Sequence, residues 1–263
     1  MRAAVLGSPI QHSLSPLLHR AAYRALGLDW AYDAVEITAP ELAGYLEGLG
    51  AEWAGLSLTR PLKEVALPLM DEVTPLARQV AAVNTVVLQG GSRLGDNTDV
   101  HGLSAAIRAL DIAPGGRAVV LGGGATARAA LVALAERDCA AVAVLARTAR
   151  PELAELAGQL GLAIDVSPLA DAPIECDLLV STLPPGVADS FAGLAAGARA
   201  LLDVVYAPWP TALARACPGR VAGGALVLLH QAARQVTALT GRPAPLDAMR
   251  AALPTHVLPL AGG

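Results

Sequence analysis

The sequence is poor in the residues on which disulfide-stabilised, nucleic-acid-binding and membrane-spanning proteins depend. Its three cysteines, Cys139, Cys176 and Cys217, are far apart and odd in number, and they show neither a metal-ligand spacing nor a disulfide framework. Acidic and basic residues are mixed along the chain with a net charge of −4, so no basic block is present to neutralise a phosphate backbone. No apolar run approaches the about 20 residues of a membrane span, and a glycine and a proline interrupt the N-terminal run too soon for a signal peptide. We therefore expect a cytoplasmic protein with neither a nucleic acid nor a membrane as partner.

The composition is that of a folded protein whose core is built from small side chains. Of the 263 residues, 54% are hydrophobic and 16% are charged, which excludes disorder of the whole chain. Aromatic residues make up only 3%. At about 150 residues per domain, the length allows one large domain or two modest ones.

Lysine and asparagine are the rarest informative residues. The chain has 18 arginines but one lysine, Lys63, and its only asparagines are Asn84 and Asn97. In a composition that favours arginine, a surface lysine is easily replaced, so a retained lysine is either a chance survivor or does something that arginine cannot. Arginine is effectively always charged, whereas lysine can give up its proton. Lys63 is therefore a candidate for proton transfer.

The first 110 residues are expected to alternate short strands and helices. Apolar or alternating runs predict strands at 3–6, 31–36 and 54–58, and a hairpin from 83–88 and 93–94. Capping and stop residues predict helices at 15–26, 40–49 and 99–110. Ser15 is predicted as a helix N-cap and Pro61 as the first position of a further helix. Lys63 would then lie in the first turn of that helix.

The rest of the chain predicts repeated strand–helix units. Apolar runs without alternation predict buried parallel strands at 118–121, 141–146, 177–181 and 200–205. Helices are expected after the first of these strands to about residue 136, and at 151–160, 226–240 and 246–253. This order predicts a parallel sheet with helices on both faces.

A glycine-rich turn directly follows the strand at 118–121 and opens a helix. The pattern Gly122-x-Gly124-x-x-Ala127 in this position is typical of a dinucleotide-binding fingerprint. The first glycine allows a tight turn, the second admits the pyrophosphate, and the phosphates meet free N–H groups at the helix N-terminus. The candidate cofactor residues here are Gly122, Gly123, Gly124, Ala125 and Thr126. A glycine-rich turn of another α/β protein is the alternative.

The end of the next strand favours NADP over NAD as cofactor. An NAD site carries an acidic residue there for the ribose hydroxyl. This chain has Ala146, Arg147 and Thr148, with Arg150 following. A guanidinium and a hydroxyl suit a 2′-phosphate. The alternative is that Arg147 is an ordinary solvated arginine.

Seven motifs, in order along essentially the whole chain, resemble those of the shikimate dehydrogenase family. The first is Gly7-Ser8-Pro9-Ile10-Gln11-His12-Ser13-Leu14-Ser15-Pro16-x-x-His19, and the glycine-rich turn is another. The others are Gly55-x-x-x-Thr59-x-Pro61-x-Lys63, Ala82-Val83-Asn84-Thr85, Asn97-Thr98-Asp99 with Gly102, Asp203-x-x-Tyr206-x-Pro208-x-x-Thr211, and Leu228-Leu229-His230-Gln231-Ala232.

The resemblance implies an NADP-dependent oxidoreductase of aromatic amino-acid and chorismate biosynthesis. It would reversibly reduce 3-dehydroshikimate to shikimate, with Lys63 and Asp99 as the acid–base pair. Implied substrate ligands are Ser13, Ser15, Thr59, Asn84, Tyr206 and Gln231, whereas Asn97 is implied as a structural partner. Val204 and Gly224 are implied to bind the cofactor. A metal is not expected, because His12 and His19 lack a third ligand nearby.

The implied α/β fold has an N-terminal α/β substrate domain and a Rossmann-type doubly wound dinucleotide-binding domain. Residues 1–101, completed by C-terminal helices at 227–263, would bind substrate in a cleft that closes, and residues 102–226 would bind NADP. The expected oligomeric state is a monomer or a homodimer.

Three departures from the family pattern and two alternative functions remain at this point. Ser57 stands where the family usually has asparagine, which puts a substrate contact in doubt. The stretch 224–228, which keeps Gly224 but has Val227, and Ala146 also depart from the usual pattern near the cofactor. The alternatives are an NAD-preferring quinate/shikimate dehydrogenase and a non-catalytic shikimate-binding paralogue. Two site residues also have structural interpretations: Asp99 could only cap the helix that it starts, and Gln231 could be an ordinary residue on a helix surface.

Overall fold

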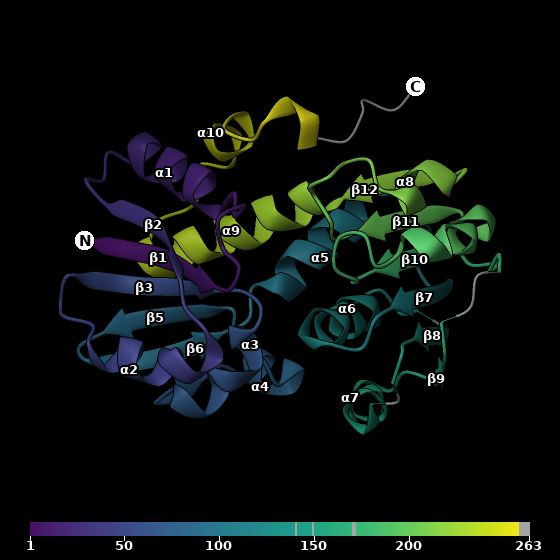
Figure 1. Ribbon diagram of the computed structural model, residues 1–263, viewed down its shortest axis with the longest axis horizontal. Helices are drawn as coiled ribbons and strands as arrows, with labels where there is room; N and C mark the ends of the chain where they lie inside the picture. Colours follow the sequence, from purple (N-terminus) through teal and green to yellow (C-terminus); the bar gives the residue numbers. More distant parts are fainter. Residues whose placement is uncertain (140, 149, 170–171, 258–263) are drawn as a thin grey trace. The chain divides into compact units, whose positions relative to one another are not determined.

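The computed structural model describes residues 1–139, 141–148, 150–169 and 172–257, and it forms two compact units (Figure 1). Unit 1 contains Met1–Asp99 and Leu229–Leu253. Unit 2 contains Val100–Leu228 and, among the described residues, 254–257. Each unit has its own six-stranded sheet, which confirms the expected α/β fold class. Among the described residues, none of the helices is both long and apolar enough to cross a membrane.

The sheet of unit 1 is mixed and has the order β2-β1-β3-β5-β6-β4. Its strands are β1 (Arg2–Gly7), β2 (Ala31–Glu36), β3 (Trp53–Leu58), β4 (Glu72–Val73), β5 (Thr85–Gln89) and β6 (Ser92–Asp96). Strands β2, β1 and β3 run parallel, whereas β5 is antiparallel to both β3 and β6. The β5–β6 pair turns at Gly90 and Gly91, both with positive φ, and confirms the predicted hairpin.

Helices cover both faces of this sheet because β3 alternates its side chains between two environments. Leu56 and Leu58 pack in one core with the short helices α2 (Leu42–Glu47), α3 (Leu62–Val65) and α4 (Pro75–Val80). Gly55 and Ser57 point to the opposite face, where α9 (Gly224–Thr240) lies. On this second face, α10 (Leu246–Ala251) packs against α1 (Ser15–Ala25). The 3-10 helices η1 (Ala39–Glu41) and η2 (Leu67–Leu69) complete the unit.

Two predicted helix starts are shifted by one residue. The N-cap of α1 is Leu14 rather than Ser15, which is the first helical residue, so the N-cap prediction is wrong. The backbone N–H of Ser15 instead donates to Ser13 Oγ at 3.3 Å, so Ser13 supplies the oxygen that the helix start needs. Pro61 is the N-cap of α3 rather than its first residue, and Lys63 still lies in the first turn.

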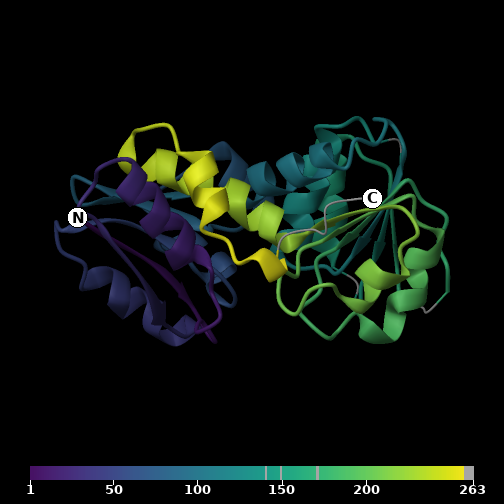
Figure 2. The same cartoon turned by 90° about the horizontal axis from the view of Figure 1, so that it is seen from above.

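The sheet of unit 2 is entirely parallel, as predicted, with the order β12-β11-β10-β7-β8-β9. Its strands are β7 (Arg117–Leu121), β8 (Ala141–Leu145), β9 (Ile164–Ser167), β10 (Leu178–Ser181), β11 (Ala200–Asp203) and β12 (Arg220–Gly223). The helices α6 (Ala125–Ala135) and α7 (Pro151–Leu160) lie on one face, and η3 (Asp189–Gly197) and α8 (Ala212–Ala216) on the other (Figure 2). This arrangement is the doubly wound architecture expected for the second half. Helix α5 (Asp99–Ala109) follows unit 1 in the chain, and η4 (Thr255–Val257) ends the described residues.

Candidate active site

The polar residues of unit 1 gather at one edge of its sheet because of the strand directions. Loops after β1 and β3 leave the carboxyl ends of two parallel strands and therefore lie at the same edge. The antiparallel strand β5 begins at this edge and β6 ends there. The predicted residues come from these positions: Ser13 and Ser15 after β1, Thr59 and Lys63 after β3, Asn84 before β5, and Asn97 and Asp99 after β6.

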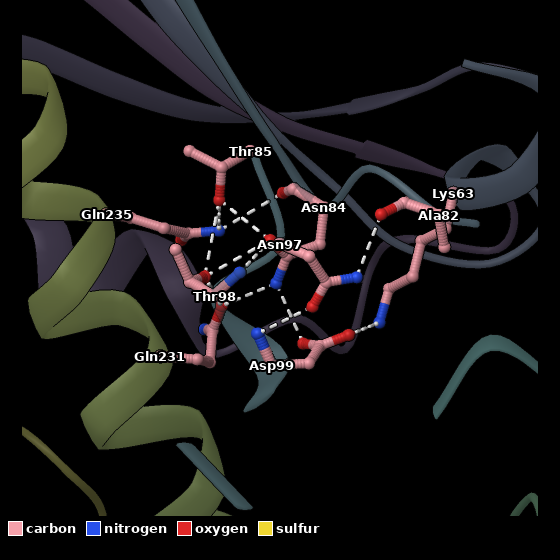
Figure 3. Close-up of polar contacts among 9 residues, drawn as sticks. All are labelled: Lys63, Ala82, Asn84, Thr85, Asn97, Thr98, Asp99, Gln231 and Gln235. Atoms are coloured by element: carbon pink, nitrogen blue, oxygen red, sulfur yellow. Dashed lines mark hydrogen bonds and ion pairs between the residues drawn. The ribbon is translucent and has the colours of Figure 1, made fainter. Parts of the chain in front are cut away.

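Lys63 and Asp99 form a partly buried ion pair at this edge (Figure 3). The Nζ of Lys63 donates to Oδ2 of Asp99 at 2.6 Å, and the side chains are 16% and 10% exposed. Lys63 is the second residue of α3 and Asp99 the first residue of α5, so each side chain starts from a helix terminus. The sequence's only lysine is thus held beside a carboxylate while retaining access to solvent.

Two asparagines, as well as Lys63, hold Asp99: Asn84 bonds its side chain and Asn97 its backbone. Asn84 Nδ2 donates to Oδ1 of Asp99 at 2.8 Å, so each carboxylate oxygen has a partner. The backbone N–H of Asp99 donates to Asn97 Oδ1 at 3.1 Å, and Asn97 Nδ2 donates to the Ala82 carbonyl at 2.9 Å. The carboxylate therefore does more than cap α5, and Asn97 is a structural partner of the pair.

Backbone groups fix the orientation of the Asn84 amide. The backbone N–H of Thr98 donates at 2.8 Å to one terminal atom of this amide, and only an oxygen can accept that bond. The hydroxyl of Thr85 donates to the same oxygen at 2.8 Å. The other terminal atom, which faces Asp99, must then be the nitrogen. Asn84 is buried, so this arrangement is shielded from water.

The remaining predicted substrate residues lie in unit 1, except for one that belongs to unit 2. Gln231 is buried on α9, and its Oε1 accepts from Asn84 Nδ2 at 3.4 Å, so it is not a helix-surface residue. Ser13 and Thr59 lie in loops at the same sheet edge as Lys63, and Ser15 is the first residue of α1 at that edge. Tyr206 belongs to unit 2, in the loop after β11.

His19 is buried in unit 1 with both ring nitrogens hydrogen-bonded. Its Nδ1 lies 3.3 Å from the Tyr23 hydroxyl and its Nε2 lies 3.2 Å from Gln235 Oε1. Burial lowers the pKa of His19 to about 3, against the smaller opposing effect of the Gln235 hydrogen bond. Its ring also stacks on Tyr32 at 3.9 Å between centroids. These contacts explain His19 as a structural residue, and the described part of the chain contains no group of three or more potential metal-ligating side chains.

The glycine-rich turn of unit 2 has the backbone that the fingerprint requires. Gly122 has a φ of +107°, and a Cβ there would lie 2.5 Å from the Thr182 hydroxyl. Gly124 is the N-cap of α6, and a Cβ built on it meets open space. Ala125 and Thr126 form the first turn of α6 and follow directly. An 11-residue helix thus presents its N-terminus beside a glycine around which a ligand has room, which fits a dinucleotide phosphate.

Two arginines follow β8 close to this turn. Arg147 and Thr148 form an exposed bend at the end of the strand. Arg150 is the N-cap of α7, and its Cγ lies 3.2 Å from the position of a Cβ on Gly123. The stem of Arg150 therefore lies against the glycine-rich turn. The sequence motifs do not include Arg150 among the site residues. The sequence indicates a role for it only indirectly, because no acidic residue is present from 146 to 150.

Val204 and Gly224 contact each other where two strands of unit 2 end. Val204 follows β11, and Gly224 follows β12 as the first residue of α9. A Cβ on Gly224 would overlap the Val204 carbonyl oxygen. Only glycine therefore fits at 224, which is a steric reason for a residue that the sequence motif suggested as a cofactor ligand.

The fold and the site together define a class of protein. A parallel sheet with a glycine turn at a helix N-terminus is typical of dinucleotide binding, and the other unit holds a lysine–carboxylate pair suited to proton transfer. This combination indicates a nucleotide-dependent oxidoreductase.

Comparison with known proteins gives the family. The model of the shikimate dehydrogenase substrate binding domain matches residues 5–86, and that of the shikimate 5'-dehydrogenase C-terminal domain matches residues 224–253. The chain is 34% identical to shikimate dehydrogenase (NADP(+)) of Synechocystis sp., over 96% of this chain and 94% of that protein. It is therefore a member of the shikimate dehydrogenase family, and the resemblance drawn from the motifs is confirmed.

Solved structures agree with this assignment. Shikimate dehydrogenase of Mycobacterium tuberculosis is 45% identical with a TM-score of 0.86, over 95% of this chain and 97% of that chain. The enzyme of Thermus thermophilus, solved in complex with NADP(H) and shikimate, is 36% identical with a TM-score of 0.81. The similarity to the second structure covers 96% of this chain and 100% of that one.

Proposed function

We propose that this protein reversibly reduces 3-dehydroshikimate to shikimate with NADPH, with Lys63 and Asp99 as the acid–base pair. The observation that carries the proposal is the 2.6 Å contact between Lys63 Nζ and Asp99 Oδ2. Asn84 holds the second carboxylate oxygen at 2.8 Å, so the pair is fixed in position before any substrate arrives.

The proton chemistry follows from the geometry of the pair. NADPH supplies the hydride when it is bound. As the carbonyl carbon gains that hydride, the Lys63 ammonium donates a proton to the carbonyl oxygen, which becomes a hydroxyl. Asp99 keeps the lysine in place and stabilises its charged form before the transfer. Lys63 is 16% exposed, so water can return the proton afterwards. In the oxidative direction the neutral amine accepts the proton from the hydroxyl. A positioned acid of this kind contributes about 10²–10⁴ in rate.

Unit 1 would bind the substrate. Asn84 and Gln231 lie next to the catalytic pair and present amide groups suited to ring hydroxyls. Ser13, in the loop after β1, and Ser15, the first residue of α1, offer hydroxyl groups to a carboxylate, and Thr59 offers a further hydroxyl. Tyr206 of unit 2 is proposed as the remaining substrate contact, on the basis of the family motif alone.

Unit 2 would bind NADP. The turn at 122–124 and the first turn of α6, with Ala125 and Thr126, would hold the pyrophosphate. Arg147 and Thr148 would bind the 2′-phosphate, and the nearby Arg150 adds a second guanidinium. Val204 and Gly224 would lie along the rest of the cofactor. No acidic residue at 146–150 is available for the ribose hydroxyl of NAD.

The cell compartment and the oligomeric state are further proposals. The three cysteines are free, which agrees with a reducing cytoplasm. A monomer or a homodimer remains the expected state.

A spectrophotometric assay tests the proposed function. Purified protein would be mixed with shikimate and either NADP or NAD, with quinate as the alternative substrate, and the absorbance of the reduced nicotinamide followed. We expect the fastest reduction with shikimate and NADP. A faster reaction with NAD or quinate would support the broader quinate/shikimate enzyme. Binding of shikimate by calorimetry without turnover on any pair would support a non-catalytic paralogue.

A further inference from the structure

Gln235 lies one helical turn after Gln231 on α9 and is buried among polar side chains. The mechanism proposed above does not use it. Its Nε2 donates to the Asn84 carbonyl at 3.2 Å and to Thr85 Oγ1 at 3.0 Å. Its Oε1 accepts from Ser57 Oγ at 2.8 Å and lies 3.2 Å from His19 Nε2. All four positions of this amide are therefore occupied by protein groups.

The donors and acceptors around Gln235 admit only one arrangement. The Asn84 carbonyl can only accept, so the amide atom beside it is nitrogen and the atom beside Ser57 and His19 is oxygen. Ser57 accepts from the Tyr32 hydroxyl at 2.6 Å, which leaves its own proton for Gln235. His19 then carries its proton on Nε2, and its Nδ1 accepts from the Tyr23 hydroxyl.

The hydrogen bonds continue from Gln235 to the catalytic pair. The Thr85 hydroxyl accepts a hydrogen bond from Gln235 and donates one to Asn84 Oδ1 at 2.8 Å. The nitrogen of the Asn84 amide then points to Asp99 at 2.8 Å (Figure 3). Each donor in this series points toward Asp99, which accepts at the end. A change at Gln235 is therefore transmitted to the orientation of Asn84.

We propose that Gln235 is a positioning residue for the reaction, acting through Thr85 and the Asn84 backbone to aim the Asn84 amide at Asp99. This inference rests on the proposed function, because it gives Gln235 an effect on the Lys63–Asp99 pair. Gln235 contacts neither member of that pair in the bonds described above. Its effect is to keep Asn84 from rotating when substrate and product exchange.

The same network explains the serine at position 57. Ser57 is buried, and its hydroxyl both accepts from Tyr32 and donates to Gln235. This hydroxyl serves the positioning of Gln235, and its proton is not available for donation to a substrate. The departure from the family pattern at 57 is therefore coupled to the glutamine at 235.

The test compares isosteric variants in a double-mutant cycle. Gln235→Met keeps the length of the side chain but removes both donated bonds, and Thr85→Val removes the hydroxyl that links Gln235 to Asn84 Oδ1. We expect kcat for shikimate oxidation to fall about tenfold in each variant. The double variant should lose little more than either single variant, because both changes break one pathway. The KM for NADP should stay unchanged, since the proposed cofactor residues lie in unit 2.

Thr237→Val is the matched control. It makes the same chemical change as Thr85→Val, on the helix that carries Gln235, but its hydroxyl donates only to the Ala233 carbonyl at 3.1 Å. It should leave kcat unchanged. If Gln235→Met lowers the melting temperature while kcat stays within twofold of the wild type, or if the two losses multiply in the double variant, the positioning role is refuted. If the wild type itself does not oxidise shikimate, the proposed function fails instead, so the two failures are distinguishable.

Discussion

Replacement of Lys63 gives the most direct test of the proposed chemistry. In Lys63→Ala the ammonium 2.6 Å from Asp99 is removed, while Asn84 still holds the other carboxylate oxygen. The site keeps its shape but loses its proton donor. We expect turnover to fall at least about 10²-fold and up to about 10⁴-fold, which corresponds to about 2.7–5.4 kcal/mol of lost transition-state stabilisation.

The binding of shikimate should change much less than turnover. The proposed ligands Asn84 and Gln231 are buried and keep their other hydrogen bonds without Lys63. We expect the calorimetric Kd for shikimate to stay within about fivefold of the wild type, as for a group that acts mainly in the transition state. Initial rates in both directions give the turnover, and calorimetry on the same preparation gives the Kd for shikimate.

Lys63→Arg separates charge from proton transfer. An arginine can pair with Asp99, but its guanidinium does not give up a proton near neutral pH. This variant should bind shikimate and unfold like the wild type while remaining as slow as Lys63→Ala. A loss of turnover smaller than tenfold in Lys63→Ala, or near-normal turnover in Lys63→Arg, would refute the assigned role.

Three further predictions concern the cofactor and the fold. Arg147→Ala should raise the KM for NADP far more than that for NAD, and equal effects in steady-state kinetics would contradict the 2′-phosphate assignment. Gly124→Ala should fold normally, because its Cβ enters open space, but it should bind NADP more weakly in titrations, because that space is the proposed place of the pyrophosphate. Gly224→Ala should instead lower the melting temperature, because its Cβ overlaps the Val204 carbonyl. The pKa of about 3 for His19 lies below its ordinary 6.5, so the unfolded chain binds the extra proton. The free energy of unfolding should therefore fall as the pH drops from 6.5 toward 3, by up to about 1.4 kcal/mol per pH unit more than in His19→Gln. Denaturant titrations at several pH values measure this free energy, and the same pH dependence in the wild type and the variant would disprove the prediction.

Much of the fold was predictable where the chain alone determines the local structure. The buried strands at β7, β10 and β11 are runs of apolar residues, and α7 follows directly from Pro151 to its glycine stop at 161. The strands β9 and β12 were missed because each has four residues and is partly exposed, so neither carries a clear apolar pattern. They are strands because neighbouring strands pair with them.

The sequence predicts the candidate site as a set of residues but not as a network. The rarity of Lys63 and the motif around Asp99 identified the pair, and the structure brings these residues together across 36 positions. Gln235 gave no signal in the sequence, because its meaning depends on contacts with Asn84 and Ser57, 151 and 178 positions away. A single sequence contains no information on such pairings until the sheet and α9 are in place.

The common direction of the hydrogen bonds behind Asn84 has an electrostatic consequence. Hydroxyl and amide dipoles from Tyr32 through Ser57, Gln235 and Thr85 are arranged head to tail, with their positive ends toward Asp99. A row of aligned dipoles stabilises negative charge at its end without a buried cation and without the desolvation penalty that such a cation would carry. Within the described part of the chain, Lys63 is the cation paired with this carboxylate, and its partial exposure lets it exchange its proton with water.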